Sequence, residues 1–359
     1  MWRQQGGGGP YTGRMATLSD VAALAGVSIS AVSRVLSDAP ATRVSAATRE
    51  RIKSAAVQLD YRPNFAGRAL KLSRSNVIAL IVPDLTNAVF TELMHGVEDA
   101  ALERDYMVLL GRAEVMKPGG ETIKKLVGEG RVDGMLVQLG DIGTPEEFGA
   151  GSGTGSGARA PVIFINSVED GHIGSVVLED ERAARLATEH LIELGHRRIG
   201  LITGDPLAYT AIRRSHGFRK AMHDAGLTVP ESYVTMLGYE ARRGREAFRL
   251  QMSQELPPTA LFIANVNAAF GALAEARIIG VRVPEDVSII AMHETWSAEN
   301  SWPPLTTVKM PLYELGTRAV QSLWARLHSG TVEDVVVSDP PPCLVLREST
   351  ARLLPAGKG

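Results

Sequence analysis

Several features that mark whole classes of protein are scarce or missing in this sequence. No apolar run approaches the roughly 18 residues that are needed to cross a bilayer. The first fourteen residues lack the apolar segment of a signal peptide. The single cysteine, Cys343, permits no internal disulfide. These absences predict a protein of a reducing compartment, the cytoplasm, in which Cys343 is a small buried residue.

Motifs for catalysis and for bound cofactors are missing as well. The histidines and acidic residues show no metal-ligand spacing, phosphate loop or nucleophile elbow. His190 and His196 fit structural positions in a helix and at its end. Residues 149–158, GAGSGTGSGA, contain Gly-x-Gly patterns, but no phosphate-loop lysine follows, so a flexible surface loop is predicted. We therefore expect no enzyme activity, no cofactor and no metal ion.

The sequence does contain an ordinary globular composition with an uneven distribution of charge. Its 359 residues, 45% apolar and 22% charged, are enough for two or three domains. The net charge is -2, yet residues 15–75 carry nine basic and only four acidic side chains. A small basic head on a larger acidic body predicts that the head alone binds a polyanion.

The stretch TLSDVAALAGVSISAVSRVL, residues 17–36, predicts two short helices joined by a tight turn. Residues 20–25 form the first helix, Gly26 breaks it, and Ser28 caps a second helix that runs to Leu36. This is the plan of a helix-turn-helix, whose second helix lies in the major groove of DNA. An ordinary helical hairpin without a ligand has the same local pattern. Five residues of the second helix are not needed for the core and are free to face DNA: Ile29, Ser30, Ala31, Ser33 and Arg34.

A third helix is predicted over residues 46–59, with Ser45 as its N-cap. Pro63 disfavours helix at the residue before it and ends this segment. Residues 65–71 have too little apolar area to form a stable helix alone. We therefore expect three short helices followed by a linker that folds on contact.

From Asn76 onward, short apolar runs alternate with longer amphipathic segments. Continuous apolar strands separated by helices are typical of parallel sheets covered on both faces. The runs form two sets of four, which predicts two similar α/β lobes with a ligand cleft at the carboxyl ends of their strands. The predicted strands are 77–82, 107–110, 135–137, 162–165, 199–202, 234–237, 261–264 and 287–292. The predicted helices are 90–104, 182–194, 212–225, 244–254, 268–279 and 312–327.

The sequence resembles the lactose-repressor family of bacterial transcription regulators over nearly all of residues 16–350. The matching segments occur in the family's order: TLSDVAALAGVSISAVSRVL, VSAATRERI, YRPN, IALIVPDLTN, ARLATEHLIELGHRRIGLITG, VPEDVSIIA and PPLTTV. The resemblance implies an all-α helix-turn-helix head, a hinge helix, and an α/β core of two Rossmann-like lobes, as in type I periplasmic sugar-binding proteins. It also implies a cytoplasmic, nucleoid-associated homodimer that represses transcription from a palindromic operator. A small effector in the cleft, a sugar or related metabolite, would set its affinity for DNA.

The resemblance implies domain limits too. They are a flexible tail (1–15), the DNA-binding head (16–62), the hinge (63–75), the core (76–352) and a second tail (353–359). Within the core, residues 76–174 and 306–331 are expected in the N-terminal lobe, and residues 175–305 and 332–352 in the C-terminal lobe.

Specific DNA contacts follow from the matching motifs. Ile29, Ser30 and Arg34 occupy the base-reading positions of the recognition helix, and arginine can bind guanine through two hydrogen bonds. Leu70 matches the hinge leucine that wedges into the minor groove, where an apolar side chain unstacks a base step and bends the DNA. Arg68 and Lys71 flank that leucine. The positions that match contacts to the DNA backbone are Thr17, Ser28, Ser33 and Asn64.

For the effector, the resemblance points to residues that follow strands on both sides of the cleft. Asp84, Asn87 and Phe90 lie after the first strand, with Phe90 placed to stack on a ring. Ile212 stands where the family often has arginine. Three positions at which the family often has aspartate are occupied by Asn166, Val266 and His293. The remaining expected contacts are Arg214, Asn265 and Trp296.

Three readings of this cleft remain open. In the first, the effector is a less polar or an anionic molecule contacted by His293 and Trp296. In the second, it is a sugar held by hydrogen bonds from Asn87, Asn166 and Asn265. In the third, the pocket has lost its ligand.

Two other classes of protein, an enzyme and a periplasmic binding protein, are alternatives to a DNA-binding regulator. An enzyme would need turnover by the core alone, and a periplasmic binding protein would need export and has no use for a basic head.

In the mechanism implied by the resemblance, a ligand favours one lobe orientation and so changes the spacing of two hinge helices. That spacing decides whether both Leu70 side chains enter the minor groove. The sequence does not distinguish an inducer from a corepressor.

Overall fold

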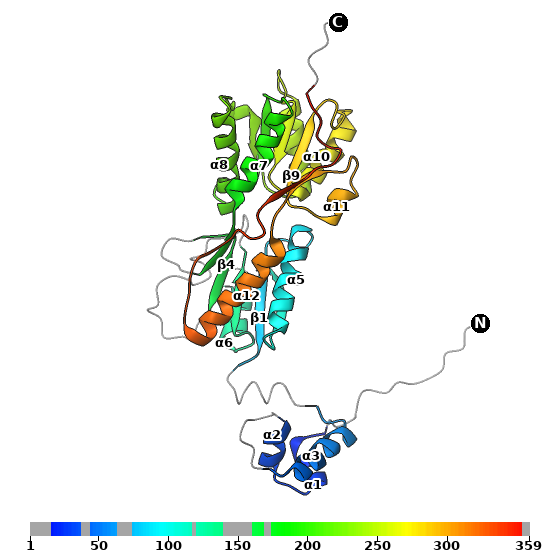
Figure 1. The fold of residues 1–359 in the computed structure, drawn as a ribbon, viewed down its shortest axis with the longest axis vertical. Helices are drawn as coiled ribbons and strands as arrows, with labels where there is room; N and C mark the ends of the chain where they lie inside the picture. Colours follow the sequence, from blue (N-terminus) through cyan, green and yellow to red (C-terminus); the bar gives the residue numbers. More distant parts are fainter. Residues whose placement is uncertain are drawn as a thin grey trace, which may run out of the picture. The chain divides into compact units, whose positions relative to one another are not determined.

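The computed structural model describes residues 16–36, 44–62, 74–116, 120–138, 160–168 and 174–353 (Figure 1). The chain divides into two compact units, residues 1–74 and residues 75–359. Several predictions concern residues outside the described ranges. They are the tails at 1–15 and 354–359, most of the hinge, and the glycine-rich loop at 149–158.

Unit 1 holds three helices in its described part: α1 (Leu18–Ala25), α2 (Ile29–Leu36) and α3 (Ala46–Gln58). Thr17 and Asp20 form a capping box, in which each side chain accepts the backbone N–H of the other residue. Gly26 ends α1 with a φ of 64°, a left-handed conformation that glycine adopts without strain. The three predicted helices are therefore confirmed, although α1 begins two residues earlier than predicted.

A small apolar core holds the three helices of unit 1 together. Val21, Val32 and Ile52, one from each helix, are fully buried. The helices α1 and α2 are bent by 106° relative to each other, an angle within the range of helix-turn-helix motifs. No single helix in the described ranges is long and apolar enough to cross a membrane, and α1 and α2 meet that test only as this bent pair.

Unit 2 consists of two lobes, each built on a six-stranded sheet (Figure 1). The first sheet has the order β11-β5-β4-β3-β1-β2, and all of its strand pairs are parallel. Its strands are β1 (Val77–Val82), β2 (Met107–Arg112), β3 (Gly134–Val137), β4 (Val162–Ile165), β5 (Ser175–Leu178) and β11 (Val335–Val337). Helices α5 (Val89–Leu102), α6 (Glu121–Gly128) and α12 (Leu312–Ser329) belong to this lobe.

The second sheet has the order β12-β10-β9-β8-β6-β7, with only the β10–β12 pair antiparallel. Its strands are β6 (Ile199–Thr203), β7 (Val234–Met236), β8 (Ala260–Ile263), β9 (Ser288–Met292), β10 (Thr306–Lys309) and β12 (Cys343–Val345). Its helices are α7 (Asp180–Glu193), α8 (Tyr209–Asp224), α9 (Ala241–Met252), α10 (Val266–Ile279) and the short α11 (Trp296–Glu299). The central strands of both sheets are buried, as their continuous apolar sequences require.

The predicted limits of the lobes need correction, because the chain crosses between the lobes three times within short segments. Residues 175–178 pair in the first sheet as β5, although they were assigned to the C-terminal lobe. Residues 306–309 pair in the second sheet as β10, and residues 335–337 in the first as β11, each opposite to its prediction. These strands have three or four residues each. Sequences this short show that a strand is possible but not which sheet it joins.

Cys343 is exposed, so its predicted burial is wrong. It begins β12, the edge strand of the second sheet, and edge positions leave one side of a strand open to solvent. On α12, Leu315, Ala319 and Leu323 lie at helical spacing and are buried, so this stripe belongs to the core of the first lobe.

Glycines allow α5 and α12 to lie in close contact, side by side in Figure 1. A Cβ atom added at Gly96 would lie 2.0 Å from the carbonyl oxygen of Tyr313. A Cβ atom at Gly316 would lie 2.4 Å from the carbonyl oxygen of Leu93. The two helices therefore touch through their backbones at this crossing.

The Gly96→Ala variant is expected to lower the free energy of unfolding by about 3 kcal/mol, because the helix backbones must separate to admit the methyl group. Gly128→Ala is the matched control: this glycine ends α6, and a Cβ atom there meets nothing within 4 Å. Alanine at that site is expected to stabilise the helix by up to about 1 kcal/mol. Urea unfolding followed by circular dichroism measures both variants. Equal stabilities of the two variants would contradict the backbone contact.

Candidate functional site

The outer face of α2 carries the residues that the sequence assigned to DNA. Ser28, Ile29, Ser30 and Arg34 are exposed, whereas Ala31 and Ser33 are half-buried. The Ser28 hydroxyl accepts the N–H of Ala31 at 3.3 Å, which caps the helix as predicted. The Arg34 Nε donates to the carbonyl oxygen of Ser30 at 3.1 Å, so its side chain lies along the helix. Thr17, the N-cap of α1, is exposed as well. The remaining predicted DNA contacts, Asn64, Arg68, Leu70 and Lys71, lie outside the described residues.

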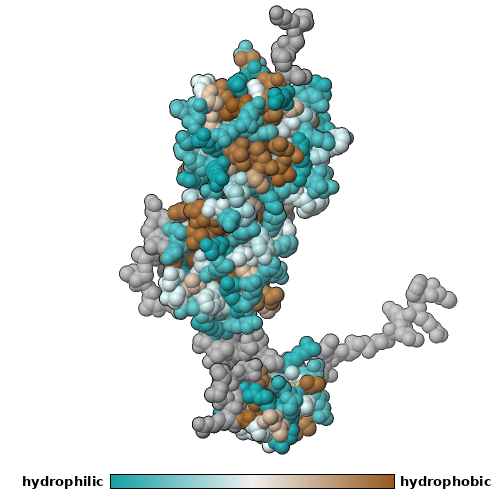
Figure 2. Space-filling model, viewed as in Figure 1, coloured by the Kyte–Doolittle hydropathy of each residue, from teal (hydrophilic) through white to brown (hydrophobic). Residues whose placement is uncertain are grey.

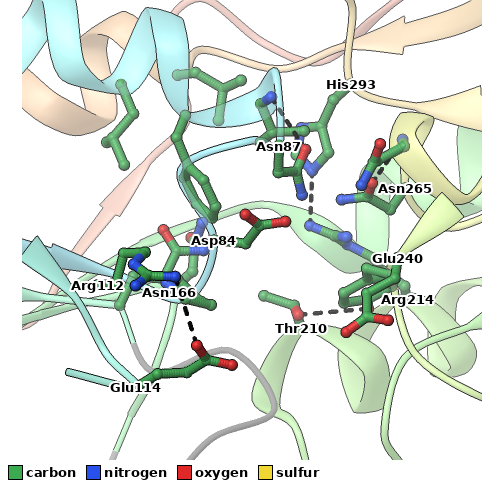
Figure 3. Close-up of a pocket in the computed structure, with 18 residues that line it drawn as sticks. Asp84, Asn87, Arg112, Glu114, Asn166, Thr210, Arg214, Glu240, Asn265 and His293 are labelled. Atoms are coloured by element: carbon green, nitrogen blue, oxygen red, sulfur yellow. Dashed lines mark hydrogen bonds and ion pairs between the residues drawn. The ribbon is translucent and has the colours of Figure 1, made fainter. Parts of the chain in front are cut away.

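A pocket of about 280 Å³ lies between the two lobes of unit 2 (Figure 3). Most of its polar residues lie at the end of a strand or within five residues after it, at the carboxyl edge of one of the sheets, where ligands bind in α/β proteins. Both lobes contribute to it. Its labelled residues in Figure 3 are Asp84, Asn87, Arg112, Glu114, Asn166, Thr210, Arg214, Glu240, Asn265 and His293.

The structure brings together seven of the ten predicted effector contacts. They are Asp84, Asn87, Phe90, Asn166, Arg214, Asn265 and His293. Sequence reasoning missed Thr210, Tyr239, Glu240 and Asn267 in the second lobe, and Arg112, Glu114 and Gln138 in the first. Arg112, Gln138 and Tyr239 lie at or just after the ends of β2, β3 and β7. The carboxyl-edge rule, applied to every predicted strand, would have found these three.

Three predicted contacts lie away from the pocket, and their assignment is corrected here. Ile212 is 52% exposed and Trp296 is 73% exposed, and neither lines the pocket. Val266 is fully buried in the hydrophobic core of the lobe. On α8, two residues correspond to a rotation of about 200°, so Ile212 and Arg214 face opposite sides. The arginine of α8 that lines the pocket is therefore Arg214, two residues after Ile212.

Arg214 is the most highly connected charged residue of the pocket. It is 3% exposed, and its Nε donates to Asp180 Oδ1 at 2.7 Å. Asp180, 1% exposed, is the first residue of α7 and lies directly after the crossing from β5. The guanidinium also donates to the carbonyl oxygen of Ala264 at 2.6 Å and lies 5.5 Å from the ring centre of Tyr239. This buried charge is thus neutralised by its own protein partner.

His293 is held neutral against Arg214. The Arg214 Nη2 and His293 Nε2 atoms are 3.0 Å apart, and since arginine can only donate, Nε2 is the acceptor and the proton is on Nδ1. Burial and the charge of Arg214 lower the pKa of His293 well below its ordinary value of 6.5. His293 Nδ1 has no hydrogen-bond partner among the described residues.

Asn166 and His293 occupy corresponding places in the two lobes. Each is the first residue after its strand, β4 or β9, and each has left-handed backbone, with φ of 49° and 75°. Each donates its N–H to the next strand of its sheet, to the carbonyl oxygens of Val176 and Val308, both at 2.9 Å. Backbone conformations of this kind cost free energy and are found at ligand sites more often than elsewhere.

The His293→Asn variant is expected to change the pH dependence of stability, and asparagine tolerates the left-handed backbone. The folded-state pKa of His293 lies below 6.5, so below pH 6.5 the unfolded chain binds a proton that the folded chain does not. This contribution to stability is complete above that pH and is lost as the pH falls. From about pH 7.5 to about pH 5.5, the wild type should lose about 1.4 kcal/mol more than the variant.

Urea unfolding of both proteins at each pH tests this prediction. His190 and His196 also have pKa values lowered by burial, but both proteins retain them, so their effects cancel in the comparison. Identical pH profiles would contradict a neutral, buried His293.

Comparisons with known proteins agree with the two units. Residues 17–64 match bacterial regulatory proteins of the lacI family, and residues 188–350 match a periplasmic binding protein-like domain. The repressor PurR of Haemophilus influenzae (strain PittEE) is 34% identical over 343 residues, 95% of this chain and 100% of the relative. The regulator DegA of Bacillus subtilis (strain 168) is 32% identical over 338 residues, 94% of this chain and 98% of the relative.

Two solved structures extend the comparison to the fold. The lac repressor dimer bound to operator and the anti-inducer ONPF superposes with a TM-score of 0.78 at 27% identity, covering 94% of this chain and 100% of that one. A LacI family transcriptional regulator from Mycobacterium smegmatis is 40% identical with a TM-score of 0.70, covering 77% of this chain and 99% of that one. The chain belongs to the lacI family of bacterial DNA-binding transcriptional regulators, which are not enzymes, and carries that family's periplasmic-binding-protein-like effector domain.

Proposed function

We propose that this regulator represses transcription as a homodimer on a palindromic operator, and that a small polar molecule in the interlobe pocket sets its affinity for DNA. The observation that carries the proposal is the presence, in one chain, of an exposed recognition helix and a buried polar pocket at the carboxyl edges of two sheets. Solved relatives support it, because the lac repressor is a dimer bound to operator and other relatives contain cellobiose or ribose. As a transcription regulator the protein acts inside the cell, where we place it on the nucleoid.

The recognition helix supplies the base contacts in this proposal. Ile29 is 51% exposed although it is apolar, and such a side chain fits the methyl group of thymine. Ser30 and Arg34, on the same exposed face, provide hydrogen bonds to base edges, with Ala31 beside them. Contacts to phosphate fix the position of the helix on the duplex. We assign them to Thr17, Ser28, Ser33 and Asn64, and the minor-groove contacts to Arg68, Leu70 and Lys71.

A second copy of the chain is the partner that we propose for β2. This edge strand leaves Met107 68% exposed and Leu110 40% exposed, and Leu102 of the neighbouring α5 is 71% exposed. An open, apolar edge strand is a site of unwanted association unless another chain covers it. In the view of Figure 2, hydrophobic residues gather in separate patches on both lobes of unit 2.

A groove in the other lobe extends the proposed dimer contact. It has a volume of about 550 Å³ and lies between α9 and α10, where Leu250, Phe270 and Arg245 are among its lining residues. Arg245 is half-exposed and pairs with the buried Glu275 at 3.2 Å, so its position is fixed in the free chain. Contacts through both lobes would make the relative positions of two heads depend on lobe orientation.

The proposed mechanism couples the pocket to lobe orientation through Arg214. This arginine lines the pocket and also binds Asp180, next to the crossing between the lobes. A ligand that binds one lobe orientation more tightly shifts the population toward it. By reciprocity, an operator that favours the same orientation tightens ligand binding by the same factor. A corepressor favours the orientation that binds DNA, and an inducer favours the other.

The Arg34→Ala variant is expected to weaken binding to the operator by about 1–3 kcal/mol, because a base contact is lost. The operator is first obtained by selection from random duplex DNA, and affinities are then measured by fluorescence anisotropy at a fixed salt concentration. Arg277→Ala, which removes an exposed arginine from α10, is the matched control and should leave the affinity unchanged. Equal losses on operator and on random DNA would contradict a base contact by Arg34.

The double variant Met107→Lys and Leu110→Lys is expected to weaken dimerisation at least about tenfold, since lysine on an edge strand discourages pairing. Sedimentation at a series of protein concentrations measures the dissociation constant, and circular dichroism confirms folding. Leu207→Lys is the control, because Leu207 is 87% exposed on a loop before α8. An unchanged dissociation constant in the β2 variant would exclude this strand from the interface.

A further inference from the structure

Three buried asparagines of the pocket share one arrangement. Asn87, Asn166 and Asn265 are 9%, 7% and 4% exposed, and all three line the pocket. In each, the side-chain oxygen Oδ1 accepts a backbone N–H from a nearby residue. The donors are Val89 at 3.2 Å, Leu178 at 3.2 Å and Asn267 at 2.8 Å, respectively.

These contacts fix which end of each amide is left for a ligand. A backbone N–H can only donate, so reversing any of the three amides would bring two donors together and leave a buried N–H unpaired. One lone pair of each oxygen is therefore used by the protein. Besides the second lone pair, what each asparagine offers in the pocket is its NH₂ group, a pair of donors.

Arg214 adds further donors to the same side of the pocket. Figure 3 shows Asn87, Asn265, His293 and Arg214 grouped together. A guanidinium has five N–H bonds. Three of those of Arg214 are directed to Asp180, to Ala264 and to His293. Because the charge of Arg214 is matched by Asp180, its remaining N–H bonds act as donors without a net positive charge.

The more exposed side chains of the pocket are mostly negatively charged acceptors, in contrast to the buried donors. Asp84 is half-buried, and Glu114 and Glu240 are exposed. Arg112 is also exposed, and its Nη1 atom lies 3.7 Å from Glu114 Oε2. Its positive charge balances only the carboxylate of Glu114. Among the described lining residues, the outer part of the pocket therefore has an excess of negative charge and of hydrogen-bond acceptors.

We propose that the effector is an uncharged molecule that turns oxygen acceptors toward the buried amides and hydroxyl or amino donors toward the acidic outer part, and that the pocket rejects phosphorylated and other anionic ligands. This inference rests on the proposed function of the pocket as an effector site. Phe90 from the first lobe and Tyr239 from the second supply apolar ring faces for the body of such a molecule. An anion would meet the excess carboxylates and would find no uncompensated cation among the buried side chains.

A panel of matched compounds tests the charge preference on the full-length dimer. D-ribose, D-glucose and cellobiose are compared by isothermal titration calorimetry with ribose phosphate, glucose phosphate, glucuronate and glucosamine. At least one uncharged sugar is expected to bind, and its phosphorylated or oxidised counterpart should bind at least about tenfold more weakly. An anionic compound that binds as tightly as its parent would overturn the inference and leave the proposed effector site intact. Absence of binding by the whole panel would overturn the proposed function, and the inference with it.

The Asn265→Asp variant tests directly whether the NH₂ group of Asn265 donates a hydrogen bond to the ligand. Aspartate retains an oxygen for the N–H of Asn267 and is as good an N-cap for α10 as asparagine, but it replaces the NH₂ donor by an acceptor. The melting temperature should therefore stay unchanged, while affinity for the uncharged sugar falls at least about tenfold. Glucosamine should lose less affinity than its parent sugar, because its ammonium group can donate to the new carboxylate.

Asn300→Asp is the control for added negative charge. Asn300 is exposed at the end of α11, outside the pocket, so this variant should bind the sugar like the wild type. If Asn265 serves only as a helix cap, Asn265→Asp will retain full sugar affinity. That result would overturn the inference even if the sugar still binds and still changes operator affinity.

Discussion

The buried ion pair between Arg214 and Asp180 is the interaction on which the arrangement of unit 2 depends. It joins α8 to the first residue of α7, directly after the chain leaves the first lobe. The same guanidinium binds the residues that directly follow β8 and β9, so one side chain contacts four elements. Burying a charged pair is costly, and removing one partner from it is strongly destabilising, so this pair holds its elements in one geometry. Here that geometry is shared by the ligand pocket and the crossing between lobes.

Much of the fold was predictable because the signals for it are local. Each helix of the head has a capping side chain and two or three buried apolar residues, and α1 ends at Gly26. Continuous apolar runs define the central strands of both sheets. The strands β5, β10, β11 and β12 were not predicted, because they are short and their pairing depends on partners far away in sequence. The lobe limits were wrong for the same reason.

The pocket was predictable in part. Residues that follow a strand, such as Asn87, Asn166 and His293, were predicted because they occupy positions of the family's motifs. Ile212 and Arg214 were both predicted, but a rotation of about 200° separates them on α8, and no local signal shows which of the two faces the pocket. The direction of the asparagine amides depends on partners such as Leu178, twelve residues from Asn166, and only the folded structure supplies them.

The edge strands β11 and β12 have a consequence for how this regulator is made. One completes the first sheet and the other completes the second, and both lie after residue 334. The first lobe therefore cannot finish folding on the ribosome until synthesis has passed residue 337, and the second lobe until it has passed residue 345. The three helices of the head end at residue 58 and can form much earlier. A nascent chain thus acquires its means of reading DNA well before it acquires the domain that controls that reading.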